Sequence, residues 1–316
     1  MIAREPVVVK RKSTLNYIRR HYMLYLLLVP GLVYIIIFKL LPYWGIQIAF
    51  RDYNIFSSSS PLAAITSSKW VGFKYFDKLL RSSSFIKLLR NTLIINGMRI
   101  LLLFVPPIIV AILLSELRKK SLRRITQTAI YIPYFFSWSI IYGIFSSVLD
   151  SYGLVNKFIT ALGGNTVNFL TDPYIFRGVL LFTDGWKTLG YNAIIYLAAI
   201  TGLDPQLYEA AKLDGASKWK QIRHITIPGI MPTIVLMLIL KVGHILDVGW
   251  EQVLIFYNPA VYDTADVIQT YVYRIGIGKL NFSQATAMEL FNSIVAFILI
   301  VGANLVSKKT LHRSIW

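Results

Sequence analysis

The chain has 316 residues, of which 55% are hydrophobic and 15% charged, and its formal net charge is +18 at pH 7. A soluble globular protein carries about a quarter charged residues, and here the shortfall is concentrated in long apolar stretches. The lysines and arginines cluster between those stretches, which favours anchoring of helix ends at a membrane over nucleic-acid binding. The absence of cysteine excludes disulfides and thiolate chemistry.

Six stretches are long and apolar enough to cross a bilayer, whose core of about 30 Å requires about 20 residues as helix. They predict an all-α, polytopic membrane protein with six transmembrane helices, and no soluble core. The spans are expected at 23–46, 92–114, 129–149, 174–200, 227–246 and 285–306.

The distribution of basic residues predicts the orientation of these spans. Lys and Arg are dense in the segments on one side, with the run RKKSLRR at 118–124 the strongest, although 51–90 on the other side is also basic. By the positive-inside rule, we expect both termini to be cytoplasmic in a multi-pass protein of the cell membrane. The expected organisation is a basic cytoplasmic segment at 1–22, a membrane domain at 23–306 and a cytoplasmic tail at 307–316.

The loop between the fourth and fifth spans, at 203–233, predicts a helical hairpin. Asp204 followed by Pro205 is typical of a helix start, because aspartate accepts hydrogen bonds at the N-cap and proline fits the first turn. A short helix is expected to run to about Asp214. Gly215 then gives the backbone the freedom for a sharp turn.

A second amphipathic stretch, from Lys218 to Ile225, follows that turn, and Pro228 is expected to open the next membrane span. Together the two short helices predict a compact helix–turn–helix at the cytoplasmic surface. Ala210 and Ala211 on the first helix are small enough to seat against another protein.

The same loop carries a spaced motif, EAA-x3-G-x9-I-x-L-P, with one departure, Ile227 in place of leucine. The matching residues are Glu209, Ala210, Ala211, Gly215, Ile225, Ile227 and Pro228. The motif resembles the loop that marks the membrane subunits of binding-protein-dependent ABC importers. The resemblance implies a type I ABC importer permease fold, with coupling helices at 204–226 that dock into a groove on an ATPase subunit. The residues to which it gives this coupling role are Glu209, Ala210, Ala211, Asp214, Gly215, Ile225 and Pro228.

Similarity to this family extends along most of the chain. The first span from Tyr25 to Asn54, WVGFKYF at 70–76 and LRNTL at 89–93 resemble carbohydrate permeases. The segments at 153–164 and 245–276 resemble a narrower branch, the permeases of Gram-positive importers for polysaccharide-derived oligosaccharides. That resemblance implies an oligosaccharide substrate and three kinds of partner: a second homologous permease subunit, two ATPase subunits and an extracellular lipoprotein solute-binding protein.

A phosphate-binding P-loop is missing from the sequence. Lys279 follows Gly278, but Tyr273 stands where the first glycine of the motif belongs and Leu280 follows the lysine. We therefore expect no enzyme activity and no cofactor in this chain, with ATP and Mg bound by the partner ATPase subunits. No pair among the four histidines has metal-ligand spacing, so no metal site is predicted.

Two alternative functions are weighed against this interpretation. The first is a permease of an ABC importer for a non-carbohydrate solute, such as an amino acid or phosphate, which would share the coupling motif. The second is a membrane enzyme or signalling protein that works without an ATPase. The coupling loop and the lack of a nucleophile, metal or phosphate constellation oppose the second.

Polar residues inside the fourth and fifth spans are candidates for the substrate path, because charged groups at membrane depth are costly unless paired or functional. The candidates are Asp184, Trp186, Lys187 and Asn192 in the fourth span, and Lys241, His244, Asp247 and Glu251 after it. If the fifth span continued as a helix, the last four would share an arc of about 120°. The alternative is a set of ion pairs in which Asp184 or Asp247 meets Lys187 or Lys241. Weaker candidates are Asn96, Arg99, Tyr131, Tyr134 and Trp138.

Overall fold

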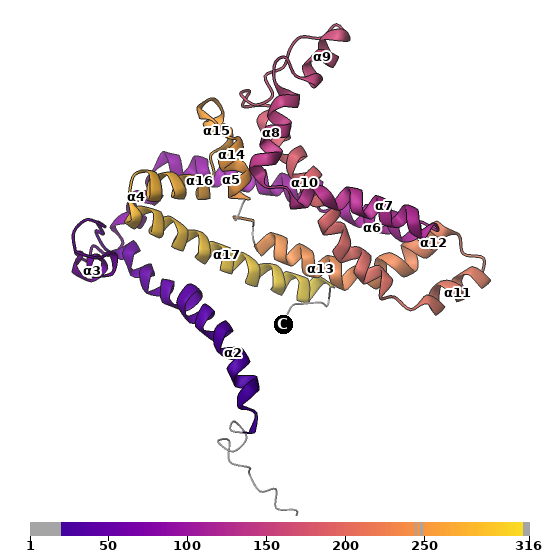
Figure 1. Cartoon of the computed structure of the whole chain (residues 1–316), viewed down its shortest axis with the longest axis horizontal. Helices are drawn as coiled ribbons and strands as arrows, with labels where there is room; N and C mark the ends of the chain where they lie inside the picture. The colour runs from indigo at the N-terminus through magenta and orange to yellow at the C-terminus, as the bar shows by residue number, and fades with distance from the viewer. Residues whose placement is uncertain (1–19, 244, 247–248, 312–316) are drawn as a thin grey trace, which may run out of the picture.

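The computed structural model describes residues 20–243, 245–246 and 249–311. This part of the chain is helical, and its only extended pairing is one antiparallel bridge between Arg51 and Trp70. The long helices α5, α6, α10, α13 and α17 lie along the long axis of the molecule (Figure 1). The short helices α3 and α4 lie at one end of this bundle, and α11 and α12 lie at the other.

The first half of the chain forms a long helical run, two short helices and the first bundle helices. Their bounds are α2 Tyr22–Ile35, continued by helical turns at Ile36–Leu40 and Leu41–Phe50, then α3 Pro61–Ser67, α4 Lys74–Leu80, α5 Ser83–Leu103, α6 Val105–Glu116, α7 Lys120–Tyr131 with a turn at Ile132–Phe135, α8 Trp138–Leu149 and α9 Leu154–Ala161.

The second half contains the longest bundle helices and several short ones between them. Their bounds are α10 Phe176–Thr201, α11 Pro205–Leu213, α12 Lys218–Gln221, a π-helical turn at Ile222–Thr226, α13 Ile227–Gly243, α14 Trp250–Phe256, a turn at Pro259–Val261, α15 Tyr262–Ala265, α16 Ile268–Tyr273, a π-helical turn at Arg274–Gly278 and α17 Phe282–Leu311.

Four helical runs in the described residues are long and apolar enough to cross a membrane: 22–50, 83–116, 218–243 and 282–306. A fifth is reached if the bent pair 120–135 and 138–161 counts as one span. Helix α10, with 26 residues, is also long enough, but polar side chains along it make it less apolar. The all-helical, polytopic class is confirmed, and the count of six stays a prediction.

The span expected at 129–149 is not one continuous helix. The chain bends by 100° between α7 and α8. Pro133 interrupts the hydrogen-bond ladder, because it has no N–H, and Phe136 is extended. Ser137 then starts α8 as its N-cap, where its hydroxyl accepts from the amide of Ile140.

The start of the fifth span also differs from the expectation. Pro228 does not open a separate helix, since the helical run is continuous from Lys218 to Gly243. A proline ring inside an α-helix clashes with the carbonyl four residues before it. The wider π-helical turn at Ile222–Thr226 lies where this clash would occur and relieves it.

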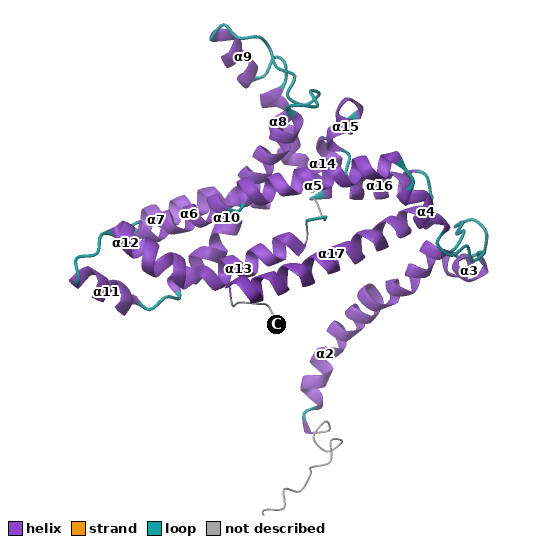
Figure 2. Ribbon diagram, turned by 180° about the vertical axis from the view of Figure 1, so that it is seen from behind, coloured by secondary structure: helices purple, strands orange, loops and turns teal. Residues whose placement is uncertain are grey.

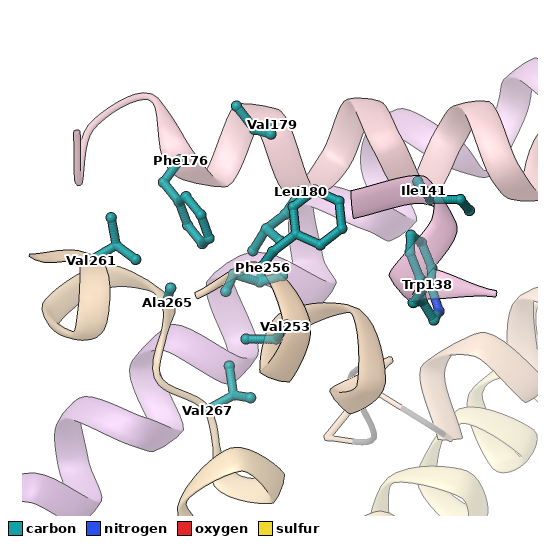
Figure 3. Packing of buried hydrophobic residues seen from close by; sticks show 11 residues of the cluster. Trp138, Ile141, Phe176, Val179, Leu180, Val253, Phe256, Val261, Ala265 and Val267 are labelled. Carbon is teal, nitrogen blue, oxygen red and sulfur yellow. The ribbon is translucent and has the colours of Figure 1, made fainter. Parts of the chain in front are cut away.

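The largest buried hydrophobic cluster joins α8, α10 and the segment from α14 to α16. Figure 3 shows Trp138 and Ile141 from α8, with Phe256 from α14 between them and Leu180 of α10. The rings of Trp138 and Phe256 meet edge to face with centroids 6.3 Å apart. This packing holds the chain that follows α13 against the bundle.

The bundle leaves its first helix uncovered. Helix α2 diverges from the other long helices in both views (Figures 1 and 2) and has no buried residue. Only the end of this run, around Ala49, is buried, in a cluster with Tyr75 and Ala287. An apolar helix of this kind requires lipid or another chain around it.

Candidate functional site

A helical hairpin at one end of the bundle contains the residues of the loop motif. Asp204 is the N-cap of α11 as predicted, and its carboxylate accepts from the amide of Gln206 at 2.9 Å. At the other end of α11, Gly215 has φ +71°, a left-handed conformation that favours glycine.

Two backbone hydrogen bonds fix the turn at Gly215. The amide of Ala216 donates to Ala211 at 2.8 Å, and that of Gly215 donates to Lys212 at 3.1 Å. This pair of bonds is the Schellman arrangement that ends many helices. Ser217 then caps α12. The helix–turn–helix predicted from the sequence is therefore confirmed as a structure.

Two side-chain contacts tie this hairpin to itself and to the bundle. The Tyr208 and Thr226 hydroxyls are 2.9 Å apart and join α11 to the start of the next span. Lys218 Nζ lies 2.6 Å from a carboxylate oxygen of Glu116 at the end of α6. A cavity of about 330 Å³ lies beneath the hairpin, between these contacts.

Most of the predicted coupling residues are exposed. Those that are exposed are Glu209, Ala210, Asp214, Gly215 and Pro228, whereas Ala211 and Ile225 are half-buried. Large apolar side chains stand beside them: Leu213 is 90% exposed and Trp219 is 68% exposed. The sequence did not single out these two residues, although exposed apolar side chains often mark a protein interface.

A second candidate site is a polar cavity of about 340 Å³ inside the bundle. Helices α5, α10 and α13 supply its charged groups, and the turn before α8 supplies an aromatic ring. Its lining residues are Asn96, Arg99, Ile100, Tyr134, Asp184, Thr188, Tyr191, Asn192, Lys241, Ile245 and Gly249.

An ion pair between two helices lines this cavity. Arg99 Nε is 3.3 Å from a carboxylate oxygen of Asp184, an approach that lies outside hydrogen-bond geometry. Arg99 also donates through an Nη atom to the side-chain oxygen of Gln252. The Gln252 amide in turn donates to the carbonyl of Leu180 and the hydroxyl of Thr183, both at 2.8 Å.

Stacked aromatic rings form one wall of the cavity. The rings of Tyr134 and Tyr191 are nearly parallel, with centroids 3.9 Å apart. Asn192 and Thr188 line the cavity beside them. Ring faces next to amides and hydroxyls are suited to a molecule that has both apolar faces and hydroxyl groups.

Lys187 lies at the break between α7 and α8. Its Nζ donates to the carbonyl of Tyr134 at 2.9 Å and to that of Phe136. It is also 5.2 Å from the centre of the Trp138 ring. The cation therefore stabilises carbonyls that the interrupted helix leaves without partners.

The cavity unites only some of the candidate path residues. Asp184, Asn192 and Lys241 line it. Trp186, by contrast, packs edge-on against Phe145, with ring centroids 5.5 Å apart. The ion pair that the structure shows for Asp184 is with Arg99, a partner that the ion-pair alternative did not name. The Asp247 half of that alternative lies outside the described residues and stays a prediction.

The expected stripe of polar residues along the fifth span is wrong as a continuous helix. Helix α13 ends at Gly243, and Glu251 lies on the separate helix α14, where it is exposed. His244 and Asp247 lie outside the described residues. The substrate roles of all these residues stay predictions.

Gln252 and Thr188 are polar residues of the site that sequence reasoning missed. Gln252 is fully buried and joins Arg99 to α10, but it has no charge to mark it inside an apolar stretch. Thr188 follows Lys187 by one residue, and only the orientation of α10 turns it towards the cavity.

The sequence and the fold of this chain are similar to those of known proteins. Residues 104–309 match the family described as binding-protein-dependent transport system inner membrane component. The chain belongs to this family. It is 43% identical to Protein LplB of Bacillus subtilis (strain 168) over 298 residues. This aligned region covers 94% of this chain and 92% of that protein.

Another relative is the polygalacturonan/rhamnogalacturonan transport system permease protein YteP of Bacillus subtilis (strain 168). It is 41% identical over 301 residues, or 95% of this permease and 92% of that protein. The fold matches, with a TM-score of 0.86 and 36% identity, a chain of a bacterial alginate ABC transporter in complex with alginate pentasaccharide-bound periplasmic protein. That match covers 96% of this permease and 100% of that chain. The type I ABC importer fold is confirmed, and the protein is a membrane permease subunit of an ABC importer.

Proposed function

We propose that this permease and a second, homologous permease subunit form the translocation path of an ATP-driven oligosaccharide importer. Two ATPase subunits bind on the cytoplasmic side and an extracellular lipoprotein solute-binding protein delivers the substrate. The observation that carries this proposal is the joint presence of the exposed hairpin and the polar cavity in a chain similar along its length to YteP. The alginate transporter, whose structure includes a loaded periplasmic protein, supports the choice of partners.

The α11–α12 hairpin is the proposed contact with the ATPase. Leu213 and Trp219 offer apolar side chains at its surface, with the motif residue Gly215 between them in the chain and Glu209 one turn before Leu213. A displaced hairpin would pull on the bundle through the Lys218–Glu116 pair. Closure of the ATPase dimer would thus switch the helices between inward-open and outward-open arrangements.

The polar cavity is the proposed part of the substrate path. Asn96 and Asn192 provide amides for sugar hydroxyls, and the stacked pair of Tyr134 and Tyr191 provides an outer ring face for a pyranose ring. Asp184 has an accepting carboxylate oxygen, although its charge is shared with Arg99. In this proposal the chain itself has no enzyme activity, and the partner ATPase subunits bind ATP and Mg and hydrolyse the ATP.

The proposed orientation places the hairpin and both chain ends in the cytoplasm. In this arrangement 1–22 and 307–316 are cytoplasmic segments, and 23–306 is the membrane domain. The basic run at 118–124, close to Glu116 and the hairpin, supports this orientation.

The test is reconstitution of the assembled complex in liposomes, with ATP hydrolysis and sugar uptake measured together. The variant Gly215→Leu should insert normally but hydrolyse ATP without uptake, because a side chain at φ +71° strains the turn that shapes the hairpin. The matched control is Gly202→Ala, at the end of α10, where the backbone is ordinary and an added Cβ makes only normal contacts.

Two outcomes would overturn the proposal. Coupled uptake by Gly215→Leu at the wild-type rate would remove the hairpin from the coupling path. Stimulation of the wild-type ATPase by a loaded binding protein for an amino acid or phosphate, and by none for a sugar, would make the chain a permease for a non-carbohydrate solute.

A further inference from the structure

Lys241 lines the polar cavity and forms no ion pair with a carboxylate among the described residues. It lies near the end of α13 that is far from the hairpin, within the span 218–243, and is half-buried. The six ion pairs among the described residues do not include it, so no carboxylate in that part of the chain lies within 4 Å of its ammonium group.

The carboxylate that faces the same cavity is already engaged. Asp184 pairs with Arg99, and both side chains are largely buried, with 18% and 11% exposed. Gln252 holds the other side of the guanidinium and is itself fixed by α10. Asp184 thus offsets Arg99, and the described lining residues keep one net positive charge, on Lys241.

A cation inside a membrane span is costly unless an anion or a wet cavity offsets it. The cavity around Lys241 has about 340 Å³ and falls in the range of small-molecule sites. Its other groups are the stacked Tyr134 and Tyr191 rings and the Asn96 and Asn192 amides, which suit a sugar ring and its hydroxyls. A neutral sugar would use these rings and amides but would leave the ammonium group of Lys241 without an anionic partner.

We propose that Lys241 binds a carboxylate of the transported sugar and makes this permease selective for acidic oligosaccharides. The inference rests on the proposed function, because it assigns a role within that substrate path. Its basis is the charge balance of the described lining residues, in which Asp184 offsets Arg99 and Lys241 has no ion-pair partner. Lys241 is the specificity-determining residue, and Arg99, held by Asp184 and Gln252, is a fixed part of the wall.

The test compares two substrates in liposomes that contain the complete complex and its binding protein. The probes are a uronic acid trisaccharide and the same trisaccharide after reduction of its carboxyl groups to alcohols. The quantity measured is the ratio of their uptake rates. Because the binding protein is the same for every variant, its own preference cancels when these ratios are compared.

Lys241→Gln should lower the acidic-to-neutral ratio by about tenfold or more, the effect of losing a charge-assisted hydrogen bond. Lys241→Arg should retain a preference for the acidic probe, because it keeps the charge. Lys78→Gln, an exposed lysine of α4 outside the cavity, should leave the ratio at the wild-type value.

An unchanged ratio in Lys241→Gln, with uptake of either probe intact, would overturn the proposal and leave the oligosaccharide function standing. Assembly of Lys241→Arg but not of Lys241→Gln would also overturn it, because the charge would then serve a contact between subunits. Uptake of neither probe nor any other sugar by the wild-type complex would instead defeat the proposed function itself.

Discussion

The α11–α12 hairpin and the polar cavity are built in opposite ways. Every backbone hydrogen bond that shapes the turn at Gly215 joins residues within five positions of one another. The cavity joins Arg99 to Asp184 and Gln252 to Leu180, residues that meet only because α5, α10 and α14 pack together. Damage to the hairpin should therefore stay local, whereas damage to the cavity should reach the whole bundle.

The largest effect is expected from Arg99→Met. It leaves the Asp184 carboxylate largely buried without its partner, which should cost about 3–5 kcal/mol in the free energy of unfolding. Thermal unfolding of the purified protein in detergent measures this. The double variant Arg99→Met with Asp184→Leu should recover much of the loss, and Lys74→Met, at the exposed pair with Asp52, should change stability by less than about 1 kcal/mol. Equal losses at the two pairs would contradict the contrast.

Gly190→Ala should come next, because α10 crosses the end of α7 at this point. An added Cβ would lie 2.0 Å from the carbonyl oxygen of Ile130, which is backbone and cannot rotate away. Overpacking of this kind costs about 1–3 kcal/mol or more. The control is Gly178→Ala on the same helix, where an added Cβ meets nothing within 4 Å. Equal melting temperatures for the two variants would show that α10 and α7 can move apart to fit the added Cβ without a loss of stability.

Asp204→Ala tests the local side of the comparison. It removes the carboxylate that accepts from the amide of Gln206, at a cost of about 1 kcal/mol. Hydrogen exchange should accelerate in α11 alone, with the bundle helices protected as before. Asp204→Asn should retain most of the protection. Faster exchange in α10 or α13 would mean that the hairpin and the bundle unfold as one unit.

The smallest effect concerns pH at the opposite end of the molecule. The hydroxyl of Tyr75 donates to Asp52 at 2.5 Å, and this bond, with that from Lys74, lowers the pKa of the Asp52 carboxyl. A lowered pKa gives stability that is present above the ordinary value near 3.8 and is lost as pH falls through the folded value.

Burial and the same bond raise the pKa of Tyr75 to about 12. The stability that Tyr75 contributes is therefore lost as pH rises above the ordinary tyrosine pKa of 10.0. Asp52→Asn should flatten the acid arm of a stability–pH curve, and an unchanged arm would assign it to other carboxylates.

Sequence reasoning succeeded where the chemistry was local. Asp204, Pro205 and Gly215 specify helix start, first turn and left-handed turn by their own backbone preferences, and the structure has each feature at its predicted place. It failed where a helix was extended without tertiary information. From the sequence, Pro133 was expected to be tolerated within a continuous membrane helix. The chain instead bends by 100° there, and Lys187 donates hydrogen bonds to the carbonyls that the bend leaves without helical partners.

By itself, the sequence determined a polytopic helical protein with a helical hairpin at 204–226, because apolar length and helix caps are properties of contiguous residues. The spaced motif in the same hairpin led to the permease family by resemblance, and its contact with an ATPase stays a prediction. The tertiary structure decided which polar groups share a cavity. It paired Asp184 with Arg99, turned Trp186 towards Phe145 and left Lys241 without a carboxylate among the described residues. The physical reason is that a charge in a membrane span takes whichever partner helix packing brings within reach, and sequence distance does not reveal that packing.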